Sequence, residues 1–208
     1  MDVTRNRMND VTGVLLAGGK SRRMGVDKRF LRFGRETLLQ RALAVYERVF
    51  TEILIVVAES GHELSDIGHR VVTDLVPNCA ALGGLYTGLS VAGSPRVFAA
   101  ACDMPFLDPA VIGHLLEWGD EDVVMPQLST GPQPMHAVYS KACLPYFEQM
   151  IAMKNLSIQA VLEHHGLRVR FVPEEVLRTF DSQLLSFRNL NTPEDVEQAR
   201  SLIQCEGQ

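Results

Sequence analysis

The chain has 208 residues, of which 46% are hydrophobic and 22% are charged, and this balance excludes a disordered protein. The 20 Lys and Arg are outnumbered by 25 Asp and Glu, so the formal net charge is −5 and the chain is a poor candidate for binding nucleic acid by charge alone. Small phosphate ligands, which need only local positive charge, remain compatible with the composition.

The sequence has no apolar run long enough to span a bilayer, and no apolar segment of the signal-peptide kind follows its first residues. We therefore expect a cytoplasmic protein without a membrane partner. Its length fits a single domain over residues 1–208. The cysteines lack C-x-x-C spacing, so we expect them to be reduced and not to hold zinc. They are Cys79, Cys102, Cys143 and Cys205.

Short apolar stretches alternate along the chain with longer stretches of helical periodicity. The predicted strands cover 11–17, 53–58, 70–73, 97–102, 122–125, 136–140 and 168–172. The predicted helices cover 37–50, 82–91, 109–118, 141–154 and 157–165, and a last helix begins at a capping box over 192–195. This alternation predicts an α/β fold with three layers, a doubly wound and mostly parallel sheet covered by helices on both faces.

Ligands of such sheets bind beyond the carboxyl ends of the strands, so the residues after each strand are the candidates. The first strand runs into Gly18 and Gly19, where the backbone can turn sharply and approach a ligand closely. Basic side chains surround this turn and favour an anion. They are Lys20, Arg22, Arg23 and Lys28. A P-loop is rejected, because its pattern needs glycine where the chain has Val14.

Two carboxylates also follow predicted strands. Asp103 comes directly after the 97–102 strand, and its hard oxygens suit Mg²⁺, although a turn-capping aspartate is the alternative. Asp74 follows the 70–73 strand. A basic loop and two acidic strand ends at one edge of the sheet predict a site for a nucleoside triphosphate with a magnesium ion.

The loop over residues 16–28 reads Leu-Ala-Gly-Gly-x-Ser-x-Arg-Met-Gly-x-Asp-Lys and closely resembles the signature loop of the molybdenum cofactor guanylyltransferases. The wider nucleotidyltransferase superfamily shares this loop. The resemblance to the guanylyltransferases extends through Asp74, the Leu-Gly-Gly of 82–84, the Cys-Asp-Met-Pro of 102–105, the segment 133–139 and the Asn-Leu-Asn-Thr-Pro-Glu-Asp of 189–195. It implies a Rossmann-like nucleotidyltransferase fold whose N-terminal part binds the nucleotide and whose C-terminal part binds the acceptor.

The resemblance further implies transfer of GMP from GTP to the terminal phosphate of molybdopterin or the molybdenum cofactor, with Mg²⁺ as cofactor. It assigns GTP binding to Leu16, Ala17, Gly18, Gly19, Lys28, Asp74 and Asp103. Catalysis falls to Lys28, Arg23 and Asp103, with Asp103 as the metal ligand. Acceptor binding falls to Gly84, Asn189 and Asn191, with Arg23 near the pterin. The expected partners are the two substrates, with transient contacts to molybdenum-insertion proteins and molybdoenzyme chaperones, and no nucleic acid.

Three alternatives stay open. Relatives that use CTP usually have alanine at the position of Gly19, so a cytidylyltransferase for the same cofactor is the less favoured choice. A sugar-phosphate nucleotidyltransferase is the second. A non-catalytic nucleotide-binding regulator is the third, and its support is two departures from the family: Ala58 stands where asparagine is frequent, and Ala80 where glycine is usual. His136 is expected in the core rather than as a general base.

Overall fold

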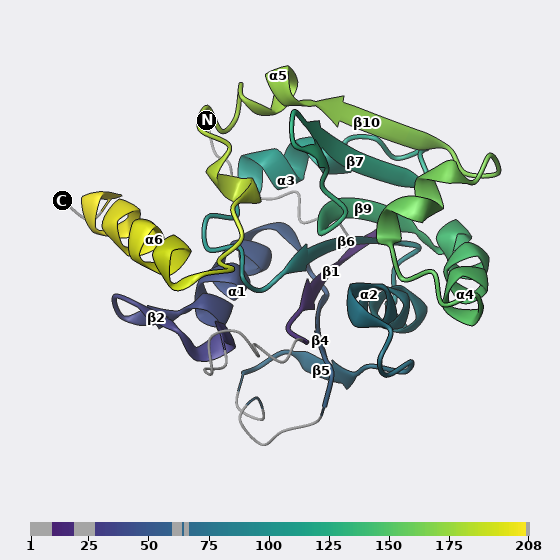
Figure 1. Ribbon diagram of the computed structural model, residues 1–208, viewed down its shortest axis with the longest axis horizontal. Helices are drawn as coiled ribbons and strands as arrows, with labels where there is room; N and C mark the ends of the chain where they lie inside the picture. Colours follow the sequence, from purple (N-terminus) through teal and green to yellow (C-terminus); the bar gives the residue numbers. More distant parts are fainter. Residues whose placement is uncertain (1–9, 19–27, 60–63, 65–66, 207–208) are drawn as a thin grey trace.

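The computed structural model describes residues 10–18, 28–59, 64 and 67–206 (Figure 1). An eight-stranded sheet forms its centre, in the order β10-β7-β9-β6-β1-β4-β5, with β8 paired to β7. The strands are β1 (Val11–Leu16), β4 (Ile53–Val57), β5 (Arg70–Thr73), β6 (Arg96–Ala101), β7 (Val123–Leu128), β8 (Gly131–Pro132), β9 (His136–Ser140) and β10 (Val169–Pro173). Only β8 and β9 pair antiparallel with their neighbours in this sheet, which confirms the mostly parallel fold predicted from the sequence.

Helices cover both faces of the sheet, as predicted. They are α1 (Leu38–Val49), α2 (Ala80–Val91), α3 (Pro109–Leu116), α4 (Leu144–Ala152), the short α5 (Glu174–Leu177) and α6 (Pro193–Glu206). Figure 1 shows α2 and α4 side by side on one face, with α1 and α3 on the other. The side chains of β1 alternate accordingly: Val11 and Leu15 join the core under α1 and α3, whereas Val14 and Leu16 join the core under α2 and α4.

A third, smaller core lies beside the sheet. We call it the hairpin cluster, because the two-stranded hairpin of β2 (Arg32–Phe33) and β3 (Glu36–Thr37) forms one side of it and α6 forms another. Its buried members are Phe33, Leu38, Leu190, Val196 and Ala199. The single turn η1 (Lys28–Phe30) leads into this hairpin, which the hydrophobic pattern did not predict.

The predicted helix starts follow from local hydrogen bonds. Thr37 caps α1 by accepting from the Gln40 amide, and the Gln40 side chain accepts from the Thr37 amide in return. At α6, the Thr192 and Asp195 side chains each accept a hydrogen bond from the other residue's backbone N–H. The capping box predicted over 192–195 is therefore confirmed.

Two predicted helices are corrected by the structure. The stretch 157–165 forms the 3₁₀ helix η4 (Ile158–Glu163), whose buried residues Ile158 and Val161 lie three apart, as suits three residues per turn. The stretch 141–154 begins as the 3₁₀ turn η3 (Lys141–Cys143) and becomes α-helical only at Leu144. Proline at position 145 accounts for this boundary, because it fits the first turn of an α-helix and no later position.

No helix among the described residues has both the length and the apolar character needed to cross a membrane. Cys79, Cys102 and Cys143 are not joined by disulfides.

Candidate active site

The carboxyl ends of the central strands bring the predicted residues to one edge of the sheet. Backbone pairing continues past the strands there: the Cys102 amide donates to the Leu16 carbonyl at 3.0 Å, and the Asp74 amide donates to the Val57 carbonyl at 2.8 Å. The chain turns after β1, β4, β5 and β6 therefore start side by side. Leu16 and Ala17 are buried, and Gly18 is the exposed residue at the rim.

Asp103 faces Lys28 across this edge. The Lys28 Nζ lies 3.4 Å from the Asp103 Oδ2, and the two side chains are only 17% and 23% exposed. Burial raises the pKa of the Asp103 carboxyl above its ordinary value, while the Lys28 ammonium acts in the opposite direction. The two residues are 75 positions apart in sequence, so the fold creates a partly buried ion pair at the place predicted for a nucleotide phosphate.

The segment 189–191 reaches the same place from the C-terminal half of the chain. The Leu190 amide donates to the Asp103 carbonyl at 3.0 Å. Asn189 is half-buried and Asn191 is exposed. Among the described residues the buried Oδ1 of Asn189 has no hydrogen-bond partner. The structure therefore places the two asparagines beside the aspartate predicted to bind metal.

Asp74 is engaged in its own turn. Its Oδ1 accepts from the Val76 amide at 3.0 Å and from the hydroxyl of buried Thr87 at 2.9 Å. The same hydroxyl oxygen accepts from the Leu75 amide at 2.9 Å. These bonds fix the connection from β5 to α2, which gives Asp74 a structural role whether or not it also contacts a nucleotide.

The glycines of the site differ in what surrounds them. A Cβ on Gly18 would lie 3.0 Å from the Ala58 amide nitrogen, so the backbones after β1 and β4 approach closely at this point. Gly84 is buried in α2, and a Cβ there would lie 3.1 Å from the Leu16 side chain. The packing of α2 on β1 therefore accounts for Gly84, and its predicted contact with the acceptor remains a prediction. Gly19 and Arg23 lie outside the described residues.

His136 is fully buried, as expected for a core residue. Its ring contacts Phe98 edge-on and lies 4.7 Å from the Phe187 ring, centroid to centroid. Burial lowers the pKa of His136 to about 3, so the imidazole is neutral at physiological pH. Nothing exposes it to a substrate.

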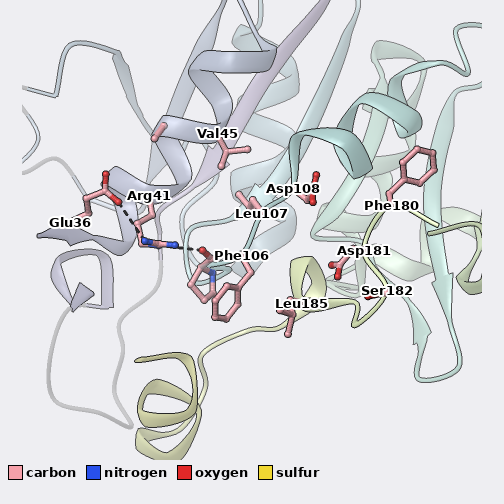
Figure 2. Close-up of a pocket in the computed structure, with 12 residues that line it drawn as sticks. Glu36, Arg41, Val45, Phe106, Leu107, Asp108, Phe180, Asp181, Ser182 and Leu185 are labelled. Carbon is pink, nitrogen blue, oxygen red and sulfur yellow. Dashed lines mark hydrogen bonds and ion pairs between the residues drawn. The ribbon is translucent and has the colours of Figure 1, made fainter. Parts of the chain in front are cut away.

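A pocket of about 440 Å³ opens next to the turn after β6 (Figure 2). One wall is formed by the Pro105–Asp108 residues of this turn, and a second by α1. Arg41 of α1 lies between Glu36, at 3.5 Å, and the Pro105 carbonyl, also at 3.5 Å. Sequence reasoning did not predict this pocket, and the residues assigned to GTP or acceptor do not line it.

A magnesium ion at this edge would have few protein ligands. Among the described residues no group of three or more His, Cys, Asp or Glu side chains could hold a metal ion by itself. Mg²⁺ in nucleotide sites typically takes one or two protein carboxylates and fills its remaining positions with water and substrate phosphates. A single rigid carboxylate at Asp103 fits that requirement.

Comparison with known proteins identifies the family of this fold. The family model described as the MobA-like NTP transferase domain matches residues 13–169. The chain belongs to the MobA-like NTP transferase family. Residues 13–169 contain the strands β4 to β9 and most of β1, and they contain both members of the Lys28–Asp103 pair.

Relatives within the MobA-like NTP transferase family cover nearly the whole chain. A molybdenum cofactor guanylyltransferase of Desulfosudis oleivorans is 37% identical over 95% of this chain and 98% of its own length. A protein of Pelotomaculum thermopropionicum named "Probable molybdenum cofactor guanylyltransferase" is also 37% identical, over 95% of each chain. The crystal structure of molybdopterin-guanine dinucleotide biosynthesis protein A from Archaeoglobus fulgidus superposes with a TM-score of 0.82 at 28% identity, covering 95% of this chain and all of that one.

Proposed function

We propose that this protein is a molybdenum cofactor guanylyltransferase, which transfers GMP from GTP to the terminal phosphate of molybdopterin or the molybdenum cofactor and releases pyrophosphate. The observation that carries the proposal is the partly buried Lys28–Asp103 pair, brought together with the segment 189–191 at the carboxyl edge of a MobA-like fold. The names of the relatives supply the substrates.

The transfer requires that the two anionic substrates be positioned and their charge neutralised, and it does not require a general base. An oxygen of the acceptor phosphate attacks the α-phosphorus of GTP, the bond from that phosphorus to the bridging oxygen breaks, and pyrophosphate leaves. Because the attacking phosphate is already anionic near neutral pH, no strong general base is required. The buried, neutral His136 is consistent with that.

Each predicted residue has a role in such a transfer. Lys28 would place an ammonium beside the triphosphate, and Arg23 would add a second cation to the approaching anions. Asp103 would hold Mg²⁺, which when bound supplies charge neutralisation on the phosphates. Leu16, Ala17, Gly18 and Gly19 would contact the nucleotide through the backbone, because a glycine turn allows close approach.

The two halves of the chain would bind different substrates. The N-terminal part, with β1, Lys28 and Asp74, would bind GTP, and the C-terminal part, with Asn189 and Asn191, would bind the acceptor. Ala58 lies at the rim beside Gly18 and has no polar side chain, so recognition of the base at this position would come from the backbone. Cytoplasmic location and transient contacts with molybdenum-insertion proteins belong to the same proposal.

A nucleotide screen with molybdopterin-loaded acceptor and pyrophosphate release as the readout tests the proposal. We expect GTP to be used in preference to CTP. We also expect Gly19→Ala to weaken the use of GTP, since it adds a methyl group where the backbone would meet the ligand. Equal or better use of CTP would favour the cytidylyltransferase, and no turnover with either nucleotide would favour the non-catalytic regulator.

A further inference from the structure

We propose that Leu190 is a positioning residue for the acceptor: its side chain is fixed in the hairpin cluster while its amide is bonded to Asp103, and it thereby holds Asn189 and Asn191 beside the predicted metal aspartate. This inference rests on the proposed function, because it concerns the acceptor of the same reaction. It adds a residue to the site that touches neither substrate.

The first step is the local conformation of the segment. Residues 188–191 form no helix or strand, so regular secondary structure does not fix the asparagines. Leu190 is 2% exposed, whereas Asn191, next to it, is exposed. Burial of the central side chain therefore determines how the two flanking asparagines are presented.

The second step is the direct bond to the site. The Leu190 amide donates to the carbonyl of Asp103, the residue whose carboxylate faces Lys28. Any displacement of Leu190 thus moves Asn189 relative to Asp103. In group-transfer reactions a misplacement of about 1 Å can cost about 10²-fold in rate, so a single hydrogen bond at this point has consequences for catalysis.

The third step is the anchoring of the segment at both ends. Upstream, the Asp181 Oδ2 accepts from both the amide and the hydroxyl of Ser186 at 2.7 Å. Downstream, the Asp195 Oδ2 accepts from the Asn191 and Thr192 amides at 2.9 and 2.8 Å. Between these two anchors, Leu190 provides the buried side chain and the bond to Asp103 that set the position of Asn189 and, together with Asp195, of Asn191.

The fourth step links the segment to Lys28. Leu31 packs against the hairpin cluster, and its amide donates to the Lys28 carbonyl at 3.1 Å. Figure 1 shows α6 lying beside the β2 hairpin and the start of α1, and the guanidinium of Arg200 on α6 lies 5.9 Å from the Phe33 ring centroid. Leu31 packs against the cluster and keeps its own bond to the Lys28 turn, so truncation of Leu190 acts directly on the asparagines and leaves that turn in place.

The test compares Leu190→Ala with Leu116→Ala, a matched control. Leu116 is also 2% exposed, but it lies at the end of α3, in the core between the sheet and helices α1 and α3 and outside the hairpin cluster. We expect Leu190→Ala to raise the KM for molybdopterin about 10-fold or more while the KM for GTP stays within about twofold. Leu116→Ala should lower the melting temperature and leave both KM values near those of the wild type.

A second readout does not depend on turnover. Hydrogen–deuterium exchange of a peptide covering 188–192 should be faster in Leu190→Ala than in the wild type and unchanged in Leu116→Ala. If Leu190→Ala does not fold, Leu190→Val takes its place and should raise the KM for molybdopterin and the exchange rate of the 188–192 peptide by smaller amounts. Leu190→Met should give values near those of the wild type.

The outcomes separate the two proposals. Absence of transfer by the wild-type protein refutes the guanylyltransferase, and the exchange experiment then still decides whether Leu190 fixes the segment. Transfer by the wild type with equal rises of the molybdopterin KM in both alanine variants, or with no rise in Leu190→Ala, overturns the positioning role alone.

Discussion

The turns after β5 and β6 start from the same sequence pattern, a short apolar strand followed by aspartate, and end in different environments. Asp74 uses its carboxylate to hold the Val76 amide and the Thr87 hydroxyl within its own turn. The Asp103 carboxylate faces the Lys28 ammonium, which comes from a distant part of the chain. The comparison shows that an aspartate after a strand can stabilise its own turn, as Asp74 does. It can also be kept in the candidate site although its burial lowers the stability of the folded protein, as for Asp103.

The pKa of Asp103 shows in which direction this residue changes the stability of the folded protein. Because burial raises its pKa in the folded protein, the native state holds the proton more tightly than the unfolded chain does. Above the ordinary pKa of an aspartate, the ionised carboxylate therefore lowers the stability of the native state. Residues retained at such a cost are typical of functional sites.

The largest effect is expected from Asp103→Asn. This change removes the negative charge and keeps the shape, so turnover should fall by at least about 10²-fold, the scale of losing one preorganised charge stabiliser. The melting temperature should stay equal or rise, because a buried charge is removed. Steady-state kinetics and thermal unfolding measure the two quantities.

Asp74→Asn is the matched control for that experiment. Its amide oxygen can still accept the bonds of the turn, so turnover should stay within about tenfold of the wild type. Equal loss of turnover in Asp103→Asn and Asp74→Asn would contradict the conclusion that, of the two aspartates, only Asp103 has a catalytic role. Substantial Mg²⁺-dependent activity in Asp103→Asn would remove the metal role from Asp103.

The next effect concerns Lys28 and pH. Lys28→Met should lower turnover by roughly 10²-fold, and Lys28→Arg should recover only part of it, since the guanidinium has a different reach. Because the ammonium lowers the pKa of Asp103, its loss should move the acid limb of the kcat/KM profile to higher pH. An unchanged acid limb in Lys28→Met would show that Asp103 is not the group that titrates there.

A smaller effect, on stability alone, is expected in the turn after β5. Asp74→Ala leaves the Val76 amide and the buried Thr87 hydroxyl without their acceptor, so unfolding should become easier by about 1–3 kcal/mol. Thr87→Val removes the partner hydroxyl. In a double-mutant cycle measured by urea unfolding, the two losses should fall short of additive, since they break one shared bond. Full additivity would contradict the structural role of Asp74.

The smallest effect is at the start of α2, where this turn ends. Ala80 has φ of +51°, a left-handed conformation that costs an alanine about 1 kcal/mol. Ala80→Gly should therefore stabilise the protein by about 0.5–1 kcal/mol. Ala81→Gly, at a position without a positive φ, is the control and should destabilise it slightly. Destabilisation by both changes would mean that the left-handed conformation at Ala80 carries no strain.

Much of the fold followed from local patterns. The strand–helix alternation, the caps at Thr37 and Thr192 and the parallel sheet all depend on side chains close in sequence. The stretch 157–165 was predicted as an α-helix and forms the 3₁₀ helix η4, because the side chains that reach the core lie three apart. The β2–β3 hairpin was not predicted, because its strands have only two residues each. Short elements leave almost no periodicity in a sequence.

The candidate site was predictable as a set of residue types and not as an arrangement. The sequence shows that each aspartate follows a strand. Because parallel strands align their carboxyl ends, it also predicts that both aspartates lie at the same edge of the sheet. It does not predict the different environments of Asp74 and Asp103, because they depend on Thr87 and Lys28, which lie 13 and 75 positions away. The roles of Gly19 and Arg23 stay predictions.

The sequence by itself determined the α/β class, the edge of the sheet where the candidate site lies, and the family resemblance of its loops, because these depend on local periodicity and short motifs. Tertiary structure alone decided that Lys28 meets Asp103, that Leu190 bonds to Asp103, and that Gly84 packs on Leu16. The physical reason is distance along the chain: such contacts form only when separate segments bury their apolar side chains in a shared core, as Phe33 and Leu190 do.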